Sequence, residues 1–266
     1  MDVSMCDLAP GDRKSADLDL ALWQIDRVQS IEHPLFEVAY GALWDAYGSK
    51  REMESRAVLA GRFALPLGML YELILVRRDG RFAAVRDHTA MAVDGEVVVH
   101  LSHNLVAPEW RRSGLAGWLR ALPLSAARRC GRANQLGREC PVTLVGEMEY
   151  GEQPENLVRL RAYEKAGFRK VDPAAVSYFQ PDFRPPGEID AVGGAQPLPF
   201  QLVIRQVGRE SEDSIATGRV RKFIGALYAL YGAQFRPCDM EHPDLLRDAC
   251  GSCANAVALL PPSDGR

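Results

Sequence analysis

The apolar positions of this sequence change period along the chain, and each change predicts a different kind of element. Between residues 18 and 62 they recur at helical spacing, first over 18–25 and again, after His33-Pro34, over 36–44. Apolar residues three and four positions apart line one face of a helix, and proline interrupts a helical run. This part of the chain therefore predicts two or three helices.

The period then becomes that of strands, in three apolar runs at 71–76, 82–93 and 96–107. An Asp-Gly pair at 79–80 separates the first two runs, and another at 94–95 separates the last two. Asp-Gly between apolar runs favours a tight hairpin, because both central residues of such a turn have positive φ. The three runs predict an antiparallel meander.

The rest of the chain alternates between the two periods. A helix is expected to start near 113–114 and to be kinked or split at Pro123, because proline lacks the amide hydrogen and its ring disturbs the preceding turn. A strand over 141–148, a helix over 156–166, strands over 176–180 and 200–207 and a helix over 220–231 follow. This order predicts an α/β (α+β) fold with a mixed, mostly antiparallel central sheet flanked by helices and a small C-terminal helical extension.

Composition narrows the class of protein. The chain has 266 residues, 47% of them apolar, with 32 basic and 35 acidic side chains, which predicts a globular core and argues against disorder and against a nucleic-acid partner. The first twenty residues lack the apolar segment of a signal peptide, and the most apolar stretch, 57–76, is broken by Arg62 and Glu72. We therefore expect a cytoplasmic protein, a monomer or homodimer, with no membrane partner and with reduced cysteines.

Residues 111–117, Arg-Arg-Ser-Gly-Leu-Ala-Gly, lie where a predicted strand runs into a predicted helix. The first amides of a helix are unpaired and point to one place, and the helix dipole adds positive potential there, so a phosphate binds favourably. Glycine lets the main chain approach a ligand, and Arg111 and Arg112 can add charge-assisted contacts to a pyrophosphate or 3′-phosphate. The segment predicts a phosphate-binding site.

Two motifs give a family resemblance. Arg111, Gly114 and Ala116 have the spacing Arg-x-x-Gly-x-Ala, with Trp110 just before them, and residues 156–168, NLVRLRAYEKAGF, supply the second motif downstream. Together they resemble the acyl-CoA signature of the GNAT superfamily of N-acyltransferases. The resemblance covers about residues 17–206 and implies a GNAT-like sheet, acetyl-CoA as the acyl donor and no metal.

The resemblance also implies a role for each matching residue. The strand end Asn104, Leu105 and Val106 is expected to pair its backbone with pantetheine, Asn156 to bond the pantetheine arm, and Tyr163 to protonate the departing thiolate. The residues expected to hold the pyrophosphate are Arg111, Arg112, Ser113, Gly114, Leu115, Ala116 and Gly117.

The group that takes a proton from the acceptor amine stays open among three residues. A cationic amine must lose a proton before it can attack a thioester. Glu147 is ranked first, since many relatives keep a glutamate on this strand. Glu149 lies two residues along, and His100 is a histidine, the residue type generally suited to proton transfer near neutral pH. Alternating Glu-Met-Glu is also typical of a solvated strand face.

Two other features of the strands carry expectations. His100 and His103 are separated by an odd interval, so they are expected to face opposite sides of their strand. The segment Arg86-Asp87-His88 is expected to lie on a solvated strand face rather than to form a catalytic pair.

The motifs divide the chain into a flexible lead-in, 1–16, an acyltransferase domain, 17–206, and a C-terminal helical extension with a cysteine-bearing tail, 207–266. Four soft ligands in that tail could close a zinc site, but their spacing fits no signature of such sites: Cys238, His242, Cys250 and Cys253. The expected function is transfer of an acetyl or other acyl group from acyl-CoA to a primary amine of a small molecule or peptide, by direct attack in a ternary complex. The alternative is an acyl-CoA-binding or sensor module without turnover.

Overall fold

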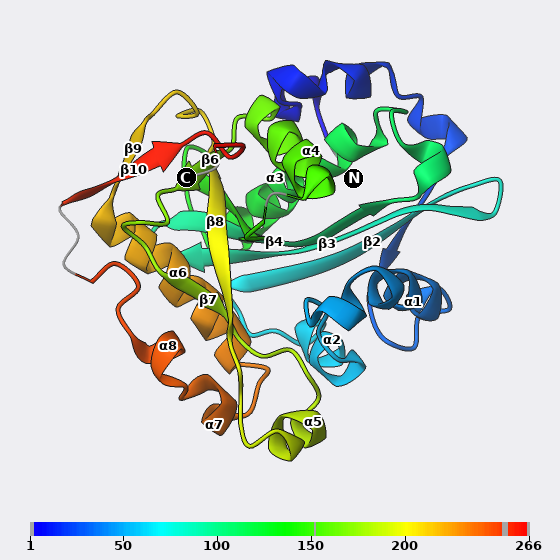
Figure 1. The fold of residues 1–266 in the computed structure, drawn as a ribbon. Helices are drawn as coiled ribbons and strands as arrows, with labels where there is room; N and C mark the ends of the chain where they lie inside the picture. Colours follow the sequence, from blue (N-terminus) through cyan, green and yellow to red (C-terminus); the bar gives the residue numbers. More distant parts are fainter. Residues whose placement is uncertain (1–2, 152, 252–254, 265–266) are drawn as a thin grey trace. The chain divides into compact units, whose positions relative to one another are not determined.

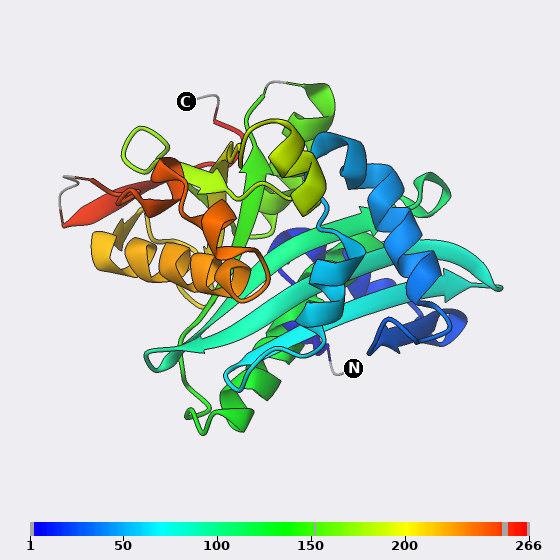
Figure 2. The ribbon, with the colours of Figure 1, turned by 90° about the horizontal axis from the view of Figure 1, so that it is seen from below.

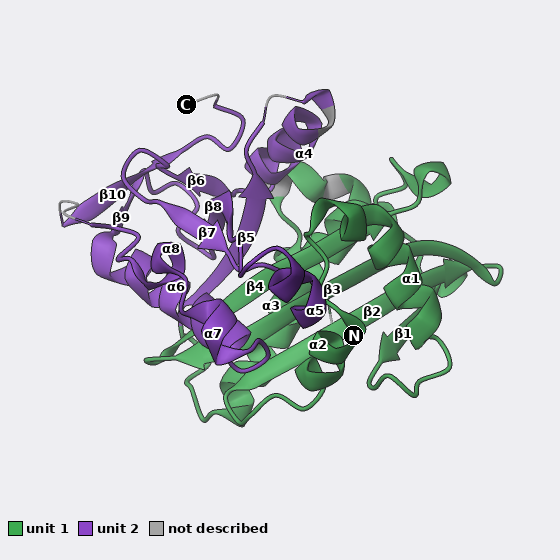
Figure 3. Cartoon of the chain, turned by 60° about the horizontal axis from the view of Figure 1, so that its bottom comes forward, with its two compact units in different colours: residues 1–140 green, residues 141–266 purple. Residues whose placement is uncertain are grey.

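The computed structural model describes residues 3–151, 153–251 and 255–264 of the chain. It divides into two compact units, residues 1–140 (unit 1) and residues 141–266 (unit 2), which are coloured separately in Figure 3. Each unit contains antiparallel strands and helices. The boundary between the units differs from the domain division expected from the motifs, and that division stays a prediction.

Unit 1 is built on the predicted meander. The strands β1 (Gln24–Val28), β2 (Met69–Arg78), β3 (Arg81–Val93) and β4 (Glu96–Val106) pair in that order, each antiparallel to the next. The Asp-Gly turn at 79–80 has φ angles of 51° and 75°, and the turn at 94–95 has 46° and 84°. These are the left-handed values that tight Asp-Gly hairpins require, so the predicted hairpins are confirmed.

The first strand replaces part of an expected helix. Leu20–Leu22 form a single 3-10 turn, and β1 pairs with β2 so that Val28 lies opposite Leu73. A strand that joins a sheet gains hydrogen bonds from distant residues, and this pairing overrides the helical spacing over 18–25. The other 3-10 helices of the unit are Met5–Asp7, Pro10–Asp17, Gly48–Lys50 and Pro108–Trp110.

Helices cover both faces of the unit 1 strands (Figures 1 and 2). The helix α3 (Leu115–Ala133) packs on one face, where Trp118 joins a core cluster with residues of β2 and β3. The helices α1 (Phe36–Tyr47) and α2 (Arg56–Arg62) pack on the opposite face, where Phe36 joins a second cluster. The strands between them are therefore enclosed on both sides.

This two-sided packing changes two expectations. Arg86, Asp87 and His88 of β3 are all buried, so a solvated face at this segment is wrong. The helix α3 continues past Pro123 as one element, so the expected split does not occur there. The segment 86–88 is buried because helices cover both faces of its strand. The helix α3 stays continuous where it packs on one of these faces.

A one-residue bulge interrupts the pairing of β3 and β4. Asp87 pairs with His103 and Thr89 pairs with His100, so two residues of β4 lie opposite the single β3 residue in between. An extra residue shifts the alternation of side chains by one position. His100 and His103 therefore face the same side of the sheet, and the expectation that they face opposite sides is wrong.

Unit 2 contains the remaining elements. The strand β5 (Val142–Glu149) is antiparallel to β8 (Leu198–Gln206), which is also antiparallel to β6 (Arg169–Val171) and β7 (Tyr178–Gln180). Near the C-terminus, β10 (Ala256–Leu260) is antiparallel to β6 and to β9 (Ser214–Ala216). The helices are α4 (Pro154–Lys165), α5 (Pro186–Ala191), α6 (Thr217–Gly232), α7 (Pro237–Met240) and α8 (Pro243–Leu246).

The predicted fold class is confirmed as a mostly antiparallel sheet with flanking helices and a C-terminal part that contains helices. The strands β9 and β10 add to this picture, because the extension contributes strands as well as α6, α7 and α8. Across the described residues, no helix is both long and apolar enough to cross a bilayer.

Arg62 and Glu54 form an ion pair inside unit 1, with 2.8 Å between Nη2 and Oε1 and 2% of each residue exposed. Removing one partner leaves an uncompensated buried charge, whereas replacing both removes the desolvation cost as well. We predict that Arg62→Met lowers the free energy of unfolding by about 3–5 kcal/mol. The double variant Glu54→Leu/Arg62→Met should recover most of this loss in urea unfolding.

The control is Arg56→Met on the same helix, because the ion pair of Arg56 with Glu37 is exposed. It should cost less than Arg62→Met. An equal loss in the two single variants would contradict burial as the cause.

Candidate functional site

Unit 1 alone forms the predicted phosphate-binding loop. After β4, the 3-10 turn Pro108–Trp110 leads to Arg112, with a left-handed φ of 68°, and to Gly114, with a φ of 94°. The helix α3 then begins at Leu115. Left-handed backbone is unfavourable for a residue with a Cβ, so the turn around Arg112 must be held by its neighbours. The turn places the first backbone amides of α3 at the end of the loop.

Trp110 anchors this loop. Its ring centroid lies 5.2 Å from that of Trp23, edge to face, and the guanidinium group of Arg78 lies over both rings, 5.2 Å from Trp23 and 5.3 Å from Trp110. Such cation–aromatic contacts fix the rings against each other. The exposed side chains of Arg111 and Arg112 directly follow this anchor.

The 3-10 helix Pro10–Asp17 packs against the start of α3. Ser15 Oγ donates a hydrogen bond to the Gly114 carbonyl, 2.6 Å away. A Cβ on Gly114 would lie 2.7 Å from the Lys14 carbonyl oxygen, and a Cβ on Gly117 would lie 2.2 Å from Ser15 Oγ. Both glycines are therefore required by this contact, whether or not a ligand binds.

Two ion pairs hold the N-terminal segment along α3. Asp12 binds Arg120 through both carboxylate oxygens, and Asp7 binds Arg128 in the same bidentate way at 2.6 and 2.9 Å. The Cγ atom of Asp12 lies 2.8 Å from where a Cβ on Gly117 would be. A carboxylate of the chain itself thus lies beside the first turn of α3, where negative charge is favoured.

Asn104, Leu105 and Val106 form the end of β4 and pair with residues 84–86 of β3. The Tyr47 hydroxyl donates to the Asn104 carbonyl at 3.5 Å. The side-chain Oδ1 of Asn104 is buried and accepts no hydrogen bond from the residues that the structure describes. A buried acceptor without a donor costs free energy, so a donor on a ligand would be stabilised there.

The two histidines of β4 differ in their contacts. His100 is buried, with Nδ1 3.3 Å from Ser102 Oγ. His103 is bound at both nitrogens, with Nδ1 2.9 Å from Asp87 Oδ1 and Nε2 2.8 Å from the Glu52 carbonyl oxygen. Burial alone would lower the pKa of His103, but the Asp87 carboxylate raises it to about 9. The ring is then a cation with two donors at neutral pH, which excludes it as a base.

In unit 2, Glu147 of β5 accepts two hydrogen bonds from tyrosines. The Tyr178 hydroxyl, from β7, donates to Oε1 at 2.5 Å, and the Tyr231 hydroxyl, from α6, donates to Oε2 at 2.6 Å. Glu147 is half-buried, whereas both tyrosines are buried. A carboxylate that accepts two hydrogen bonds is favoured in its ionised form.

Glu149 has a different partner. Arg159 of α4 forms an ion pair with the Glu149 carboxylate and donates to Asn156 Oδ1 at 3.0 Å. A full cation beside a carboxylate stabilises the ionised form, and so weakens it as a base, more than the neutral hydroxyls on Glu147 do. Arg159 therefore links two predicted site residues and argues for Glu147 over Glu149 as the proton acceptor.

Tyr163 lies in the last turn of α4. Its ring is buried, edge to face against Phe168 with centroids 4.8 Å apart. This packing accounts for the ring as a core residue, and the role of its hydroxyl as an acid stays a prediction.

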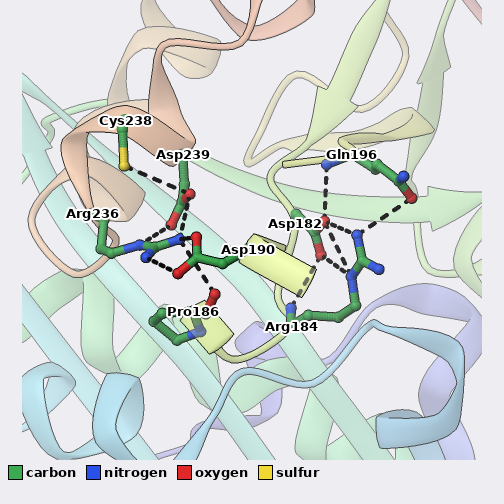
Figure 4. Close-up of polar contacts among 8 residues, drawn as sticks. All are labelled: Asp182, Arg184, Pro186, Asp190, Gln196, Arg236, Cys238 and Asp239. Atoms are coloured by element: carbon green, nitrogen blue, oxygen red, sulfur yellow. Dashed lines mark hydrogen bonds and ion pairs between the residues drawn. The ribbon is translucent and has the colours of Figure 1, made fainter. Parts of the chain in front are cut away.

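Ion pairs tie the C-terminal helices to the loop that follows β7 (Figure 4). Arg236, just before α7, binds Asp190 of α5 at 2.9 Å and Asp239 of α7 at 2.8 Å. A second pair, Arg184 with Asp182 at 2.6 Å, lies within the loop itself. The turn between α6 and α7 is thus held to both α5 and α7 by ion pairs of Arg236.

The soft ligands of the tail have separate environments. Cys238 is exposed, Cys250 is buried, and His242 Nδ1 accepts the Asp244 amide at 3.2 Å. In the part of the chain that the structure describes, no three histidine, cysteine, aspartate or glutamate side chains gather to hold a metal ion. Cys253 lies outside the described residues.

Within each unit, the structure groups the predicted residues by their partners. Residues 111–117 form one continuous loop and helix start in unit 1. In unit 2, Glu149 and Asn156 share Arg159, whereas Glu147 contacts two tyrosines that belong to no motif. Side chains that meet only through the packing of distant elements leave no local signal in a sequence.

No family model matches the sequence, and no curated protein matches it significantly. Solved structures do match. A protein named as a GNAT-family acetyltransferase from Bacteroides thetaiotaomicron is 15% identical, covering 69% of this chain and 86% of that chain, with a TM-score of 0.44. The ribosomal-protein-S18-alanine N-acetyltransferase of Escherichia coli is 14% identical, covering 70% and 94%, with a TM-score of 0.38. The matching structures are consistently GNAT-family acetyltransferases.

One further match is to a longer protein. The GCN5-related glucosamine N-acetyltransferase region of a fungal multi-domain β-N-acetylglucosaminidase is 18% identical, with a TM-score of 0.42. The alignment covers 64% of this chain and 20% of the fungal chain. All three of these matches have sequence identities below 20% and TM-scores below 0.5.

The Asp87–His103 pair predicts a pH dependence of stability. The pKa of His103 is about 9 in the folded protein and about 6.5 in an unfolded chain. The folded state therefore binds more protons between these values, and the stabilisation is complete below about pH 6.5 and lost as the pH rises through about 9. The melting temperature should fall over this window, and His103→Gln should be less stable at pH 6 and should flatten the slope.

His33→Gln, which alters an imidazole outside this pair, is the control and should keep the slope of the unaltered protein. A His103→Gln variant with that same slope would show that another group titrates.

Proposed function

We propose that this protein is an acyl-CoA-dependent N-acyltransferase, which moves an acetyl or other acyl group to a primary amine by direct attack in a ternary complex. The observation that carries the proposal is the loop between β4 and α3, where left-handed Arg112 and Gly114 lead into a long helix. Helix amides, the helix dipole and the exposed guanidinium groups all favour negative charge, as a pyrophosphate would supply.

Three groups of residues are assigned to acyl-CoA. We assign the pyrophosphate to residues 111–117 and pantetheine to residues 104–106, with Asn156 as a further contact of the pantetheine arm. The buried Oδ1 of Asn104 fits this assignment, because a ligand could supply the donor that it lacks among the described residues. When bound, acyl-CoA supplies an activated thioester.

Glu147 is the preferred proton acceptor. Glu149 forms an ion pair with the Arg159 cation, whereas neutral hydroxyls donate to Glu147. The His100 ring is buried, whereas Glu147 is half-buried. In this scheme Glu147 accepts one proton from the acceptor ammonium, which leaves a neutral amine that can attack the acyl carbon. Tyr163 gives its phenolic proton to the sulfur as the C–S bond breaks, and it recovers a proton from the nitrogen of the new amide.

The acceptor is proposed to be a primary amine of a small molecule or a peptide. The similar solved structures are named for acceptors of both kinds, an alanine of a ribosomal protein in Escherichia coli and glucosamine in the fungal region. An amine panel therefore needs peptides with free amino termini as well as amino sugars.

An acyl-CoA-binding or sensor module is the second candidate, and the burial of Tyr163 favours it. The ring of this proposed acid packs in the core, edge to face against Phe168. A tyrosine that serves only the core would leave the departing thiolate without its acid. Binding without turnover would be the outcome expected of such a module.

The proposal predicts amine-dependent release of thiol. The full chain is incubated with acetyl-CoA and the amine panel, and free thiol is followed with a chromogenic reagent while calorimetry measures CoA binding. Thiol release that depends on one class of amine supports the acyltransferase. Binding without release on any amine supports the module, and the absence of CoA binding contradicts both.

The loop predicts a second result. The double variant Arg111→Ala/Arg112→Asn removes both exposed guanidinium groups, and asparagine tolerates the left-handed backbone at position 112. Hydrogen bonds to charged groups contribute about 1.5–3 kcal/mol, so CoA affinity should fall by about tenfold or more in calorimetry. The control is Arg132→Ala, an exposed arginine about 25 Å along the axis of the same helix. Equal affinity in the two variants would refute the assignment of the loop.

A further inference from the structure

The carboxylate of Glu147 is held by hydroxyls whose rings are fixed by packing. The Tyr178 ring stacks on Tyr228 with centroids 5.6 Å apart and planes 16° apart, and the Tyr231 ring lies 5.4 Å from that of Phe183. Tyr178 is 2% exposed and Tyr231 is fully buried. Neither hydroxyl can leave the carboxylate without a change in the core, so the two hydrogen bonds set the orientation of Glu147.

The helix that carries Tyr231 is attached to β5 at a second point. Near the start of α6, Arg219 Nη2 donates to Thr143 Oγ1 at 3.3 Å, and Arg219 Nη1 donates to Gln206 Oε1 of β8 at 2.5 Å. Thr143 and Glu147 are four residues apart on β5, so their side chains lie on one face of that strand. The helix α6 therefore lies along β5, and Tyr231 reaches Glu147 from a fixed support.

The Tyr178 hydroxyl stays protonated, and so remains a donor, well above neutral pH. Burial raises the pKa of Tyr178 well above its usual value, and the charge of Glu147 raises it further. Burial also raises the pKa of Tyr228, and the charge of Glu147 adds to this, but the Tyr228 hydroxyl donates its hydrogen bond to the Phe179 carbonyl at 3.0 Å rather than to Glu147. Hydrogen bonds donated to both oxygens favour the carboxylate anion.

We propose that Tyr231, with Tyr178, is a positioning residue for Glu147, so that the C-terminal helix α6 completes the group that receives the acceptor proton. The proposal rests on the proposed function, in which Glu147 accepts a proton from the ammonium of the acceptor. The two hydroxyls keep Glu147 ionised and oriented when the cationic acceptor arrives. The extension is then part of the catalytic machinery rather than an appendage.

The test compares Tyr231→Phe with Tyr228→Phe in the full chain. Both variants keep the ring and remove one hydroxyl from the same helix, but only Tyr231 bonds to the Glu147 carboxylate. Thermal unfolding of the two checks that both fold. The ionisation of Glu147 is followed by carboxyl-carbon NMR with Glu147→Gln to assign its signal, and kcat/KM is measured against pH with the amine that gives thiol release.

In Tyr231→Phe the carboxylate loses one donor, so its titration and the acidic limb of the kcat/KM profile should both move to higher pH. Below that limb kcat/KM should fall by about tenfold or more, while KM for acyl-CoA stays unchanged. Tyr228→Phe should leave the titration and the profile in place.

Four results separate the possible failures. An unchanged Glu147 titration in Tyr231→Phe overturns the positioning role, as does an equal shift in Tyr228→Phe. A shifted titration with an unmoved rate profile overturns the catalytic part of the proposal while acyl transfer itself stands. If the unaltered protein releases no thiol on any amine, the proposed function fails and this proposal fails with it.

Discussion

Unit 1 encloses β3 on both faces, and every charged side chain of the enclosed strands must therefore find a partner inside the protein. Glu72 of β2 is buried, and burial alone would raise its pKa, but the hydrogen bond with His88 and the nearby charges of Arg129 and Arg27 lower it to about 2. Asp87 finds its partner in His103. The meander is held together by these ionic contacts as well as by its apolar clusters. The loop that follows β4 therefore starts from a well-packed strand.

Local chemistry accounts for the parts of the fold that could be predicted. The two Asp-Gly turns define the meander because the required left-handed backbone is a property of the turn residues themselves. Local sequence could not predict the strands β1, β9 and β10, because these segments become strands only by pairing with distant segments. The bulge of β4 belongs to the same class, because pairing with β3 decides where the extra residue goes.

The candidate site divides in the same way. Residues 111–117 are contiguous, so a loop and a helix start suffice to define them, and the structure forms both. The partners of Glu147 lie 31 and 84 residues further along the chain. No spacing rule connects such residues. Glu147 and Glu149 differ in their partners, two tyrosines and Arg159, and the tertiary structure alone determines these partners.

The glycines at 114 and 117 have two independent reasons to be glycine. A phosphate would need a close approach of the main chain, and the N-terminal segment already makes that approach from within the protein. Packing alone would keep this half of the motif in a chain that had lost its ligand. The side chains of Arg111 and Arg112 are exposed, so packing does not require arginine at these two positions. They are therefore the half of the motif whose presence or loss among homologues would track ligand binding.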